Sequence, residues 1–315
     1  MFPELFRIPF LNYSVHSYGL MLVIGLLLGI ELAKFLARRS GLNPDHFANA
    51  AILALVSGLI GARIAYVAQF PSDFTGGTVG QNVWTAINLT SGGLVYYGGF
   101  LLATPTLIVY AIVKRIPVLR GMDIIAPCLM IGLAFGRIGC FLNGCCWGQH
   151  CELPSPLAVR FPYFSPPYLD DYQNNRVTPP PALFQTDLVK HTSRLMTPEQ
   201  IKAQKDLATT AAAERSLPVI NTQLISTVTA LLIAGVAFCF FTLGGTPGRG
   251  FALMLMLEGS SRFLIEGLRV EPSVLGPLTV SMLIGLGVAL GGVTLWIAAG
   301  VAQKERPVAS TPAVA

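Results

Sequence analysis

Apolar residues fill this chain in long stretches separated by short polar segments, a pattern typical of membrane-spanning helices. A helix needs about 20 mainly apolar residues to cross a bilayer, and lipid offers no partner for an unpaired backbone group. Stretches that approach or exceed this length occupy 18–37, 47–69, 92–113, 122–143, 219–243, 250–267 and 276–300. The pattern predicts an all-α, polytopic membrane protein with seven transmembrane helices.

Composition points to the same class of protein. Of 315 residues, 53% are hydrophobic and 12% are charged, and the mean hydropathy is +0.61, whereas soluble domains average about 25% charged residues. The net charge of +5 is small, so we expect no nucleic-acid partner. Residues 1–17 lack the basic-then-apolar order of a cleavable signal peptide, so we expect insertion to begin with the first span.

Basic residues in the short connections predict the orientation, because they are retained on the cytoplasmic side. The opposite short segments hold only Arg7 and Arg269. The N-terminus is therefore expected outside and the C-terminus in the cytoplasm. The basic residues that follow the first, third, fifth and seventh spans are Arg38, Arg39, Lys114, Arg115, Arg120, Arg249, Lys304 and Arg306.

The long, proline-rich connection 144–218 then lies outside. Within it, 195–215 has the pattern of one amphipathic helix, with Thr197 as N-cap and Pro198 at the first helical position. We predict that 144–218 forms a small extracytoplasmic head inserted into a single integral membrane domain, 1–315. A solvated linker is the alternative.

Several ionisable and polar residues lie inside the predicted spans, where they are costly and by default indicate function. The helix directions place the following at one depth in the outer half: Arg63, Arg137, Arg262, Glu266, Tyr18, Tyr97 and Gln223. The surplus of arginine favours an anionic ligand such as a lipid phosphate. The sequence thus predicts one polar site shared by several helices.

A purely structural interpretation of these charges stays open. Arg262 is four residues from both Glu258 and Glu266, so the three can neutralise one another on one helix face. Arg63 lies near a helix end and can extend to the lipid headgroups. Glu31 and Lys34, spaced by three, form a local ion pair in this interpretation.

Four of the six cysteines lie close together in the sequence, after the fourth span. Cys128 and Cys239 are isolated within spans and are interpreted as small hydrophobes. The others, Cys140, Cys145, Cys146 and Cys151, match no standard zinc or iron–sulfur spacing. We therefore expect no metal and no cofactor. An extracytoplasmic location permits a disulfide from Cys151 to Cys145 or to Cys146.

The segment GRIGCFLNGCCWG at 136–148 resembles the signature of bacterial prolipoprotein diacylglyceryl transferases, in which a Gly-Arg pair leads into Asn-Gly and a closing glycine. Further blocks follow the family's order over most of the chain, and only the loop 150–215 is unmatched in detail. These blocks lie at 16–25, 61–67, 92–99, 221–224 and 262–269.

The resemblance implies a reaction in a bacterial inner membrane. The diacylglyceryl group of phosphatidylglycerol, a membrane lipid, would move to the lipobox cysteine thiol of a prolipoprotein signal peptide. A thioether forms and glycerol phosphate leaves. The resemblance assigns catalysis to Arg137, Arg262, Glu266 and Tyr97, with the two arginines on the lipid phosphate, and substrate binding to Tyr18, Arg63, Gly98, Gly99, Asn143, Gly148 and Gln223.

The sequence departs from the family pattern at positions close to the chemistry. Tyr97 stands where many members have a histidine suggested as the base, Cys140 replaces an asparagine, and Cys145 replaces a glutamate. Glu258 replaces a tyrosine, and a Gln-Leu-Tyr-Glu block reads QLIS at 223–226. The base is therefore open between Glu266, Tyr97 and loss of the proton to water.

Two other functions remain compatible with the residues. A catalytically silent homologue that binds phospholipid or lipoprotein precursors is favoured by Tyr97. A transporter is conceivable because intramembrane charges also mark ion pathways, although these charges share one layer.

Overall fold

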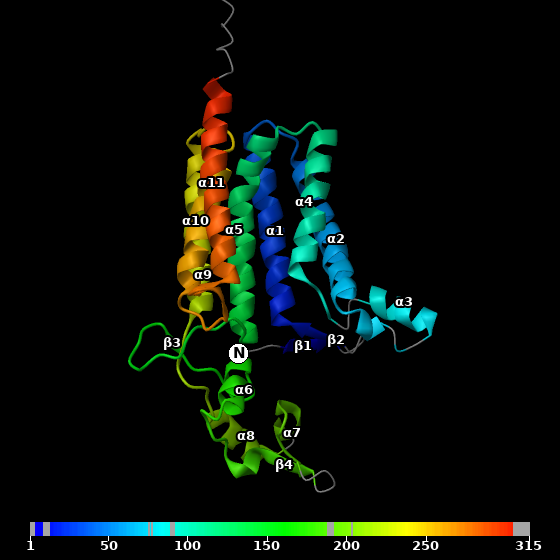
Figure 1. The fold of residues 1–315 in the computed structure, drawn as a ribbon, viewed down its shortest axis with the longest axis vertical. Helices are drawn as coiled ribbons and strands as arrows, with labels where there is room; N and C mark the ends of the chain where they lie inside the picture. The colour runs from blue at the N-terminus through cyan, green and yellow to red at the C-terminus, as the bar shows by residue number, and fades with distance from the viewer. Residues whose placement is uncertain are drawn as a thin grey trace, which may run out of the picture.

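The computed structural model describes residues 4–8, 13–74, 76, 78–88, 92–187, 192–202 and 204–304, and it is mainly helical (Figure 1). Each apolar stretch predicted from the sequence coincides with one long helix. These helices are α1 (Ser17–Arg39), α2 (Pro44–Gln69), α4 (Tyr96–Val113), α5 (Val118–Asn143), α9 (Thr222–Thr242), α10 (Arg249–Glu266) and α11 (Val280–Lys304). Arg306, assigned to the cytoplasmic side from the sequence, lies outside the described residues.

Within the described part of the chain, five helices are long and apolar enough to cross a membrane: α1, α2, α5, α9 and α11. Helix α4 has the same character but is shorter. Helix α10 carries Arg249, Glu258, Arg262 and Glu266 within its 18 residues, which lowers its hydropathy. The chain is therefore a multi-pass membrane protein with at least these five candidate spans.

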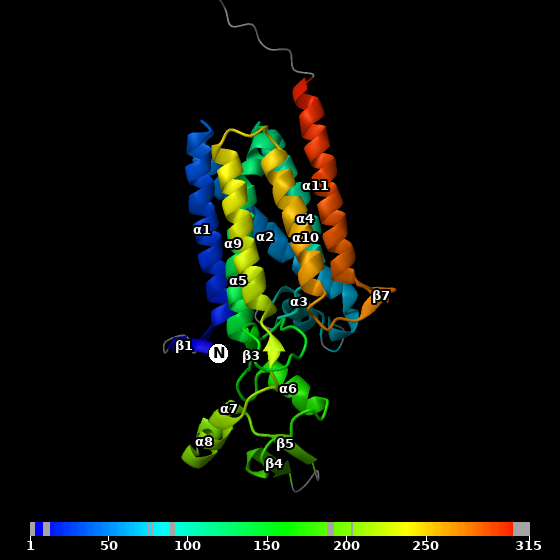
Figure 2. The same cartoon turned by 90° about the vertical axis from the view of Figure 1, so that its left-hand side faces the viewer.

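Helix α5 runs through the middle of the bundle, packed between α1 and α9 (Figures 1 and 2). Helix α10 packs on α11 and α9, and α2 packs on α4 and α1. Small residues allow this close packing: Ala126, Ala234 and Ala237 are buried in the core between α5, α9 and α10. Large apolar side chains such as Leu232 point outward instead, where lipid would cover them.

Residues 144–218 fold at the end of the bundle where α5 ends and α9 begins (Figure 2). We call this segment the head; it has a hydrophobic core of its own around Leu183, Ile201 and Ala211. Its elements are β3 (Ala158–Val159), α6 (Pro166–Gln173), η2 (Pro181–Leu183), β4 (Phe184–Asp187), β5 (Thr192–Leu195), α7 (Pro198–Lys202) and α8 (Lys205–Ala213).

The prediction of one amphipathic helix over 195–215 is wrong. Thr197 does cap a helix, since its N–H donates to Gln200 Oε1 at 2.8 Å, but this helix is the short α7. Gln204 then has extended backbone, with φ −127° and ψ 107°, and α8 begins anew. The apolar residues of both helices still reach one core because the break lets α8 fold back on α7.

The expectation of an all-α fold also misses short strands in the connections. The described residues include four antiparallel two-stranded pairs. Gly276, at φ 59°, makes the tight turn that lets β7 (Ser273–Leu275) pair with β8 (Leu278–Thr279). The other pairs join β1 (Glu4–Ile8) to β2 (Tyr13–His16), β3 to β6 (Val219–Ile220), and β4 to β5. The remaining short elements are η1 (Pro71–Phe74) and α3 (Val79–Ile87).

Candidate functional site

The end of α5 and the start of α9 are bound together by a tight loop. Gly144, at φ 74°, ends α5 in the left-handed region, and the chain turns back so that Cys145 N–H donates to Cys140 O at 3.0 Å. From α9, Thr222 Oγ1 donates to Cys146 O at 2.8 Å and Gln223 Nε2 donates to Cys145 O at 2.9 Å. The loop is thus held from both sides.

Gly148 has a steric reason to be glycine. Its N–H donates to Ile220 O at 2.9 Å, and a Cβ there would lie 2.8 Å from both Ile220 O and Thr222 Cγ2. Its neighbour Gln149 donates to the end of α10, from N to Leu268 O at 2.8 Å and from Nε2 to Gly267 O at 2.9 Å. One loop therefore sets the relative positions of α5, α9 and α10.

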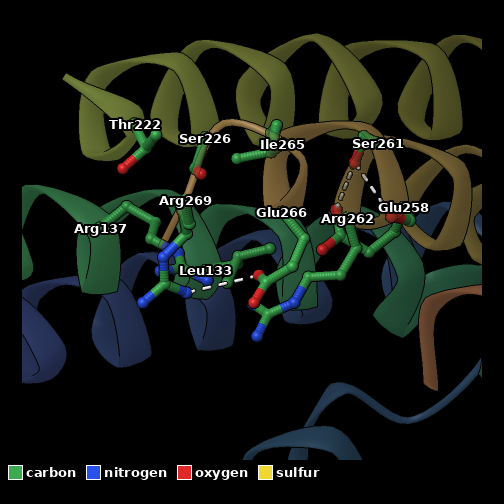
Figure 3. Close-up of a pocket in the computed structure, with 10 residues that line it drawn as sticks. All are labelled: Leu133, Arg137, Thr222, Ser226, Glu258, Ser261, Arg262, Ile265, Glu266 and Arg269. Atoms are coloured by element: carbon green, nitrogen blue, oxygen red, sulfur yellow. Dashed lines mark hydrogen bonds and ion pairs between the residues drawn. The ribbon is translucent and has the colours of Figure 1, made fainter. Parts of the chain in front are cut away.

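A polar cavity lies between these three helices (Figure 3). Its space is about 20 Å³, little more than one water molecule. Three arginines and two glutamates line it, so its walls carry one surplus positive charge when all are ionised. The lining residues are Leu133, Arg137, Thr222, Ser226, Glu258, Ser261, Arg262, Ile265, Glu266 and Arg269.

The three arginines are held in different ways. Arg137 forms no hydrogen bond or ion pair with any residue that the structure describes, although it points into the cavity (Figure 3). Arg262 donates from Nε and Nη2 to Ser281 Oγ of α11, at 3.0 and 2.7 Å. Arg269 pairs with Glu266 at 3.4 Å and with Glu271 at 2.8 Å. Arg137 is thus the guanidinium most available to a ligand.

The two carboxylates are not partners of Arg262. Glu266 is 3% exposed and pairs with Arg269, while Glu258 Oε2 accepts from Ser261 Oγ at 3.3 Å. Among the described residues, no ion pair joins Arg262 to either glutamate, and Glu266 pairs with Arg269, three residues further along, instead. The expected local pair of Glu31 and Lys34 is confirmed, at 2.8 Å.

Arg63 lies elsewhere in the fold. It is 7% exposed, and its guanidinium donates to the carbonyl oxygens of Thr85, Ala86, Gly92 and Gly93 at 2.5–2.9 Å. It therefore joins α2 to the end of α3 and to the segment before α4, and it does not extend to lipid headgroups. The expectation that Arg63 faces the cavity of Arg137 and Arg262 is wrong in geometry.

Tyr97, Gly98 and Gly99 also lie outside this cavity. Tyr97 is 55% exposed on α4, a helix that packs mainly on α2. A Cβ on Gly99 would lie 2.8 Å from Gly58 O, and one on Gly98 would overlap Gly61, so both glycines serve the crossing of α4 over α2. The structure does not bring Tyr97 to the cavity, and its role in catalysis stays a prediction.

The remaining predicted residues surround the cavity without lining it. Tyr18 packs at the start of α1 against Gly139, where a Cβ would lie 3.0 Å from its ring. Asn143 is the last residue of α5, directly before the turn at Gly144. Gln223 is 1% exposed, and its Oε1 has no hydrogen-bond partner among the described residues. These residues support the loop that joins α5 to α9.

The family model of prolipoprotein diacylglyceryl transferase matches residues 3–298 of the chain. The chain belongs to this family. A Nostoc protein named phosphatidylglycerol–prolipoprotein diacylglyceryl transferase is 27% identical over 88% of this chain and 83% of its own length. A Trichormus variabilis protein of the same name is 27% identical over 93% and 88%. A Rhodopirellula baltica protein of that name is 40% identical, but the match covers 47% of this chain and only 30% of that protein.

Sequence reasoning missed two residues of this transferase-family site. The sequence gives Arg269 no role at the cavity, although it ends the block 262–269 and its position three residues after Glu266 and seven after Arg262 indicates the same helix face. Ser281 gave no signal, because nothing in the sequence shows which α11 residue meets Arg262.

Three of the chain's six cysteines lie beside the cavity. All six are free thiols, so the disulfide considered for Cys151 is not formed. The sulfur atoms of Cys140, Cys145 and Cys146 lie within 4.8 Å of one another. Hydrogen bonds from the Cys140 and Cys145 thiols lower the pKa of Cys146, and the nearby charges of Arg269 and Arg137 lower it further.

Proposed function

We propose that this chain transfers the diacylglyceryl group of phosphatidylglycerol to the lipobox cysteine of prolipoproteins. The family match and the names of the relatives support this activity. The protein acts in a bacterial inner membrane, with α4 and α10 completing seven spans. Its N-terminus lies outside, its C-terminus lies in the cytoplasm, and 144–218 is an extracytoplasmic part of one membrane domain.

The observation that carries the mechanism is Arg137, whose guanidinium has no hydrogen bond or ion pair among the described residues and faces two further arginines. Arg137 is partly buried, and a lipid phosphate would supply a counter-ion for it. Arg137 and Arg262 approach the cavity from α5 and α10, so two planar forks can hold one phosphate from two sides. Arg269 can contribute a third positive charge if its guanidinium leaves Glu266 and binds the phosphate.

The reaction requires the phosphate to leave with the electron pair of a carbon–oxygen bond. The acceptor thiolate attacks the glyceryl carbon, the carbon–sulfur bond forms, and glycerol phosphate departs. Guanidiniums fixed beside the departing oxygens stabilise the charge that develops there. The cavity holds little more than one water molecule as it stands, so the arginine side chains have to move apart to admit the phosphate.

The position of the cavity supports access from the outer leaflet. It lies where α5 ends, α9 begins and the head starts, the end of the bundle predicted to face outward (Figure 2). Phosphatidylglycerol and a translocated signal peptide both reach this side of the membrane. The charged residues of the cavity gather at one point between α5, α9 and α10, whereas an ion pathway would need polar groups along the bundle.

The deciding experiment measures transfer from phosphatidylglycerol to a lipobox peptide by the purified protein. Arg137→Ala should lower turnover at least about a hundredfold, because removing one preorganised transition-state donor costs roughly 2.7–4 kcal/mol. Arg160→Ala, an exposed arginine of the head, is the matched control and should transfer normally. A wild-type protein that binds phosphatidylglycerol but neither transfers nor complements a transferase-depleted strain would instead be a silent homologue.

A further inference from the structure

Two backbone conformations bring three cysteines together at the end of α5. Cys140 is buried in the last turn of the helix, and Gly144 then reverses the chain at φ 74°. Cys146 has φ 61°, a conformation that few residues other than glycine adopt. As a result, the sulfur atoms of Cys140, Cys145 and Cys146 lie within 4.8 Å of one another.

The cluster is held rigidly from outside. Gln223 and Thr222 donate to the carbonyl oxygens of Cys145 and Cys146, and the Cys145 thiol donates to Cys140 O at 3.7 Å. His150, which follows in the same loop, is engaged with the head: its Nε2 lies 2.7 Å from Asp171 Oδ1. Among the described residues, the group of possible ligands at this point consists of the three thiols alone.

Three converging thiolates are soft ligands that select zinc or copper(I). Zinc is tetrahedral, and its catalytic sites keep three protein ligands and leave the fourth position to water or substrate. Three thiolates and one Zn²⁺ carry a net charge of −1, and the adjacent cavity has one more arginine than it has glutamates. The donor set therefore suits zinc with one open position.

The cluster also adjoins the proposed reaction site. Thr222 lines the arginine cavity and also donates a hydrogen bond to Cys146 O, so it links the cavity to the cluster. The acceptor thiol needs help to ionise, because a free cysteine has a pKa near 8.5. Tyr97, which stands at the expected place of a base, lies away from this cavity. A metal beside the cavity would meet that need, because a thiol that coordinates zinc is deprotonated outright.

We propose that Cys140, Cys145 and Cys146 bind a zinc ion that takes the acceptor cysteine of the prolipoprotein as its fourth ligand. This replaces the sequence-based expectation of no metal, and the catalytic part rests on the proposed function. The acceptor thiol loses its proton to water as its sulfur binds zinc. The bound thiolate attacks the glyceryl carbon while the carbon–oxygen bond to phosphate breaks, and the neutral thioether product, a weaker ligand, dissociates.

The first test is metal content, measured on protein purified in detergent without added chelator. We expect about one zinc per chain in the wild type and in Cys151→Ser, because three protein ligands can hold the ion and leave its fourth position open. Cys145→Ser and Cys140→Ser should lose it. Cys151 is the matched control because it lies in the same loop but outside the cluster. Thermal unfolding verifies that each variant is folded, and a misfolded Cys140→Ser leaves Cys145→Ser to decide.

The second test is spectroscopic and does not depend on turnover. Cobalt(II) in place of zinc should give a thiolate-to-metal absorption band that changes when a lipobox peptide is added. The same peptide with serine in place of its cysteine should leave the band unchanged. A band that ignores both peptides would show that the metal does not take the acceptor.

Transfer assays then separate this inference from the proposed function. Removing zinc should lower turnover at least about a hundredfold, the lower end of what a positioned proton-transfer group contributes, and zinc should restore it. Three results would overturn the zinc proposal and leave the proposed transferase function unaffected. They are full transfer by folded zinc-free protein, a site that holds only copper, and a disulfide within the cluster. A peptide-sensitive zinc site without any transfer overturns the transferase and leaves the metal site intact.

Discussion

Asp123 of α5 accepts a hydrogen bond of 2.7 Å from the backbone N–H of Gly248, at the start of α10. Its second oxygen accepts from Phe251 N–H at 2.8 Å, and the carboxylate is 3% exposed. The first N–H groups of a helix have no partner within that helix, and a negative charge there also complements the helix dipole. Asp123 therefore caps α10 across the bundle.

Asp123→Ala should destabilise the protein by about 1–3 kcal/mol, the cost of leaving buried backbone donors unsatisfied. Asp123→Asn should lose less, because its amide oxygen still accepts one of the two bonds. The measurement is thermal unfolding in detergent, with Asp45→Ala as control, since Asp45 is an exposed acidic residue in the first turn of α2. Equal unfolding temperatures for Asp123→Ala and the wild type would contradict this role.

Arg63 should behave as a structural residue and not as a phosphate ligand. Arg63→Ala leaves four backbone carbonyl groups without their donor, so it should cost at least the roughly 1.5–3 kcal/mol of one hydrogen bond to a charged group. Arg63→Lys should recover only part of this, because lysine cannot span the four oxygens. The measurement is thermal unfolding, with Arg160→Ala as control. A stable Arg63→Ala protein with lost transfer would return Arg63 to the substrate site.

The contrast between Arg137 and Arg63 shows what the sequence can predict here. Apolar length and loop charge give the helices and their directions, and these give the depth of each polar residue. Depth placed Arg137, Arg262 and Glu266 in one layer, and the structure brings all three to one cavity. Depth does not give the direction of a side chain around its helix axis, and the structure places Arg63 against the end of α3 and Tyr97 outside the arginine cavity.

The loop and the head were less predictable for a different reason. The convergence of the three thiols depends on the left-handed backbone conformation of Cys146. Because Cys146 is not a glycine, the sequence does not indicate this conformation. Likewise, the break at Gln204 depends on the core that α7 and α8 share. Helical propensity over 195–215 favoured one helix, and tertiary packing overrode it.

The head should lose stability in alkaline solution through Tyr168. This side chain is fully buried and donates to Glu214 Oε2 at 3.0 Å, and burial together with that bond raises its pKa above the usual 10.0. The folded head thus favours the neutral phenol, so this contribution is complete below pH about 10 and declines as the pH rises further. Limited proteolysis of the head between pH 8 and 11 measures it.

Tyr168→Phe is the matched variant for this prediction. It loses the hydrogen bond to Glu214 at every pH, but it has no phenol to ionise. Its cleavage rate should therefore rise less steeply above pH about 10 than that of the wild type. Parallel profiles for the two proteins would mean that other groups cause the alkaline transition.

Tyr97→Phe should lower transfer only modestly, by less than about tenfold, because one hydrogen bond contributes about 0.5–1.5 kcal/mol. Tyr97 lies outside the arginine cavity in which the phosphate would be held. The measurement is kcat and KM for the lipobox peptide in wild type and variant. A loss as large as that of Arg137→Ala would make Tyr97 a direct participant in the reaction.

Ser281 should act as a positioning residue for Arg262. Its hydroxyl oxygen accepts from both Nε and Nη2 of the guanidinium, at 3.0 and 2.7 Å, and thereby fixes the direction of the fork. Ser281→Ala keeps the charge of Arg262 but removes the hydrogen bonds that orient its guanidinium. Turnover should fall about two- to tenfold, corresponding to the roughly 0.5–1.5 kcal/mol of a hydrogen bond, while Ser281→Thr should retain most of it.

A double-mutant cycle distinguishes this positioning role from a general effect on α11 packing. If Ser281 acts through Arg262, then Ser281→Ala should have no further effect on kcat in an Arg262→Ala protein, because residues that share one interaction are not additive. If instead Ser281→Ala disturbs the contact of α10 with α11, the two losses should add, and the unfolding temperature should drop with them. The cycle requires transfer rates for the wild type, both single variants and the double variant, measured on folded protein. Non-additivity with unchanged stability is the expected result, because the hydroxyl touches the guanidinium directly while Gly259 and Gly285 provide the close contact between the two helices.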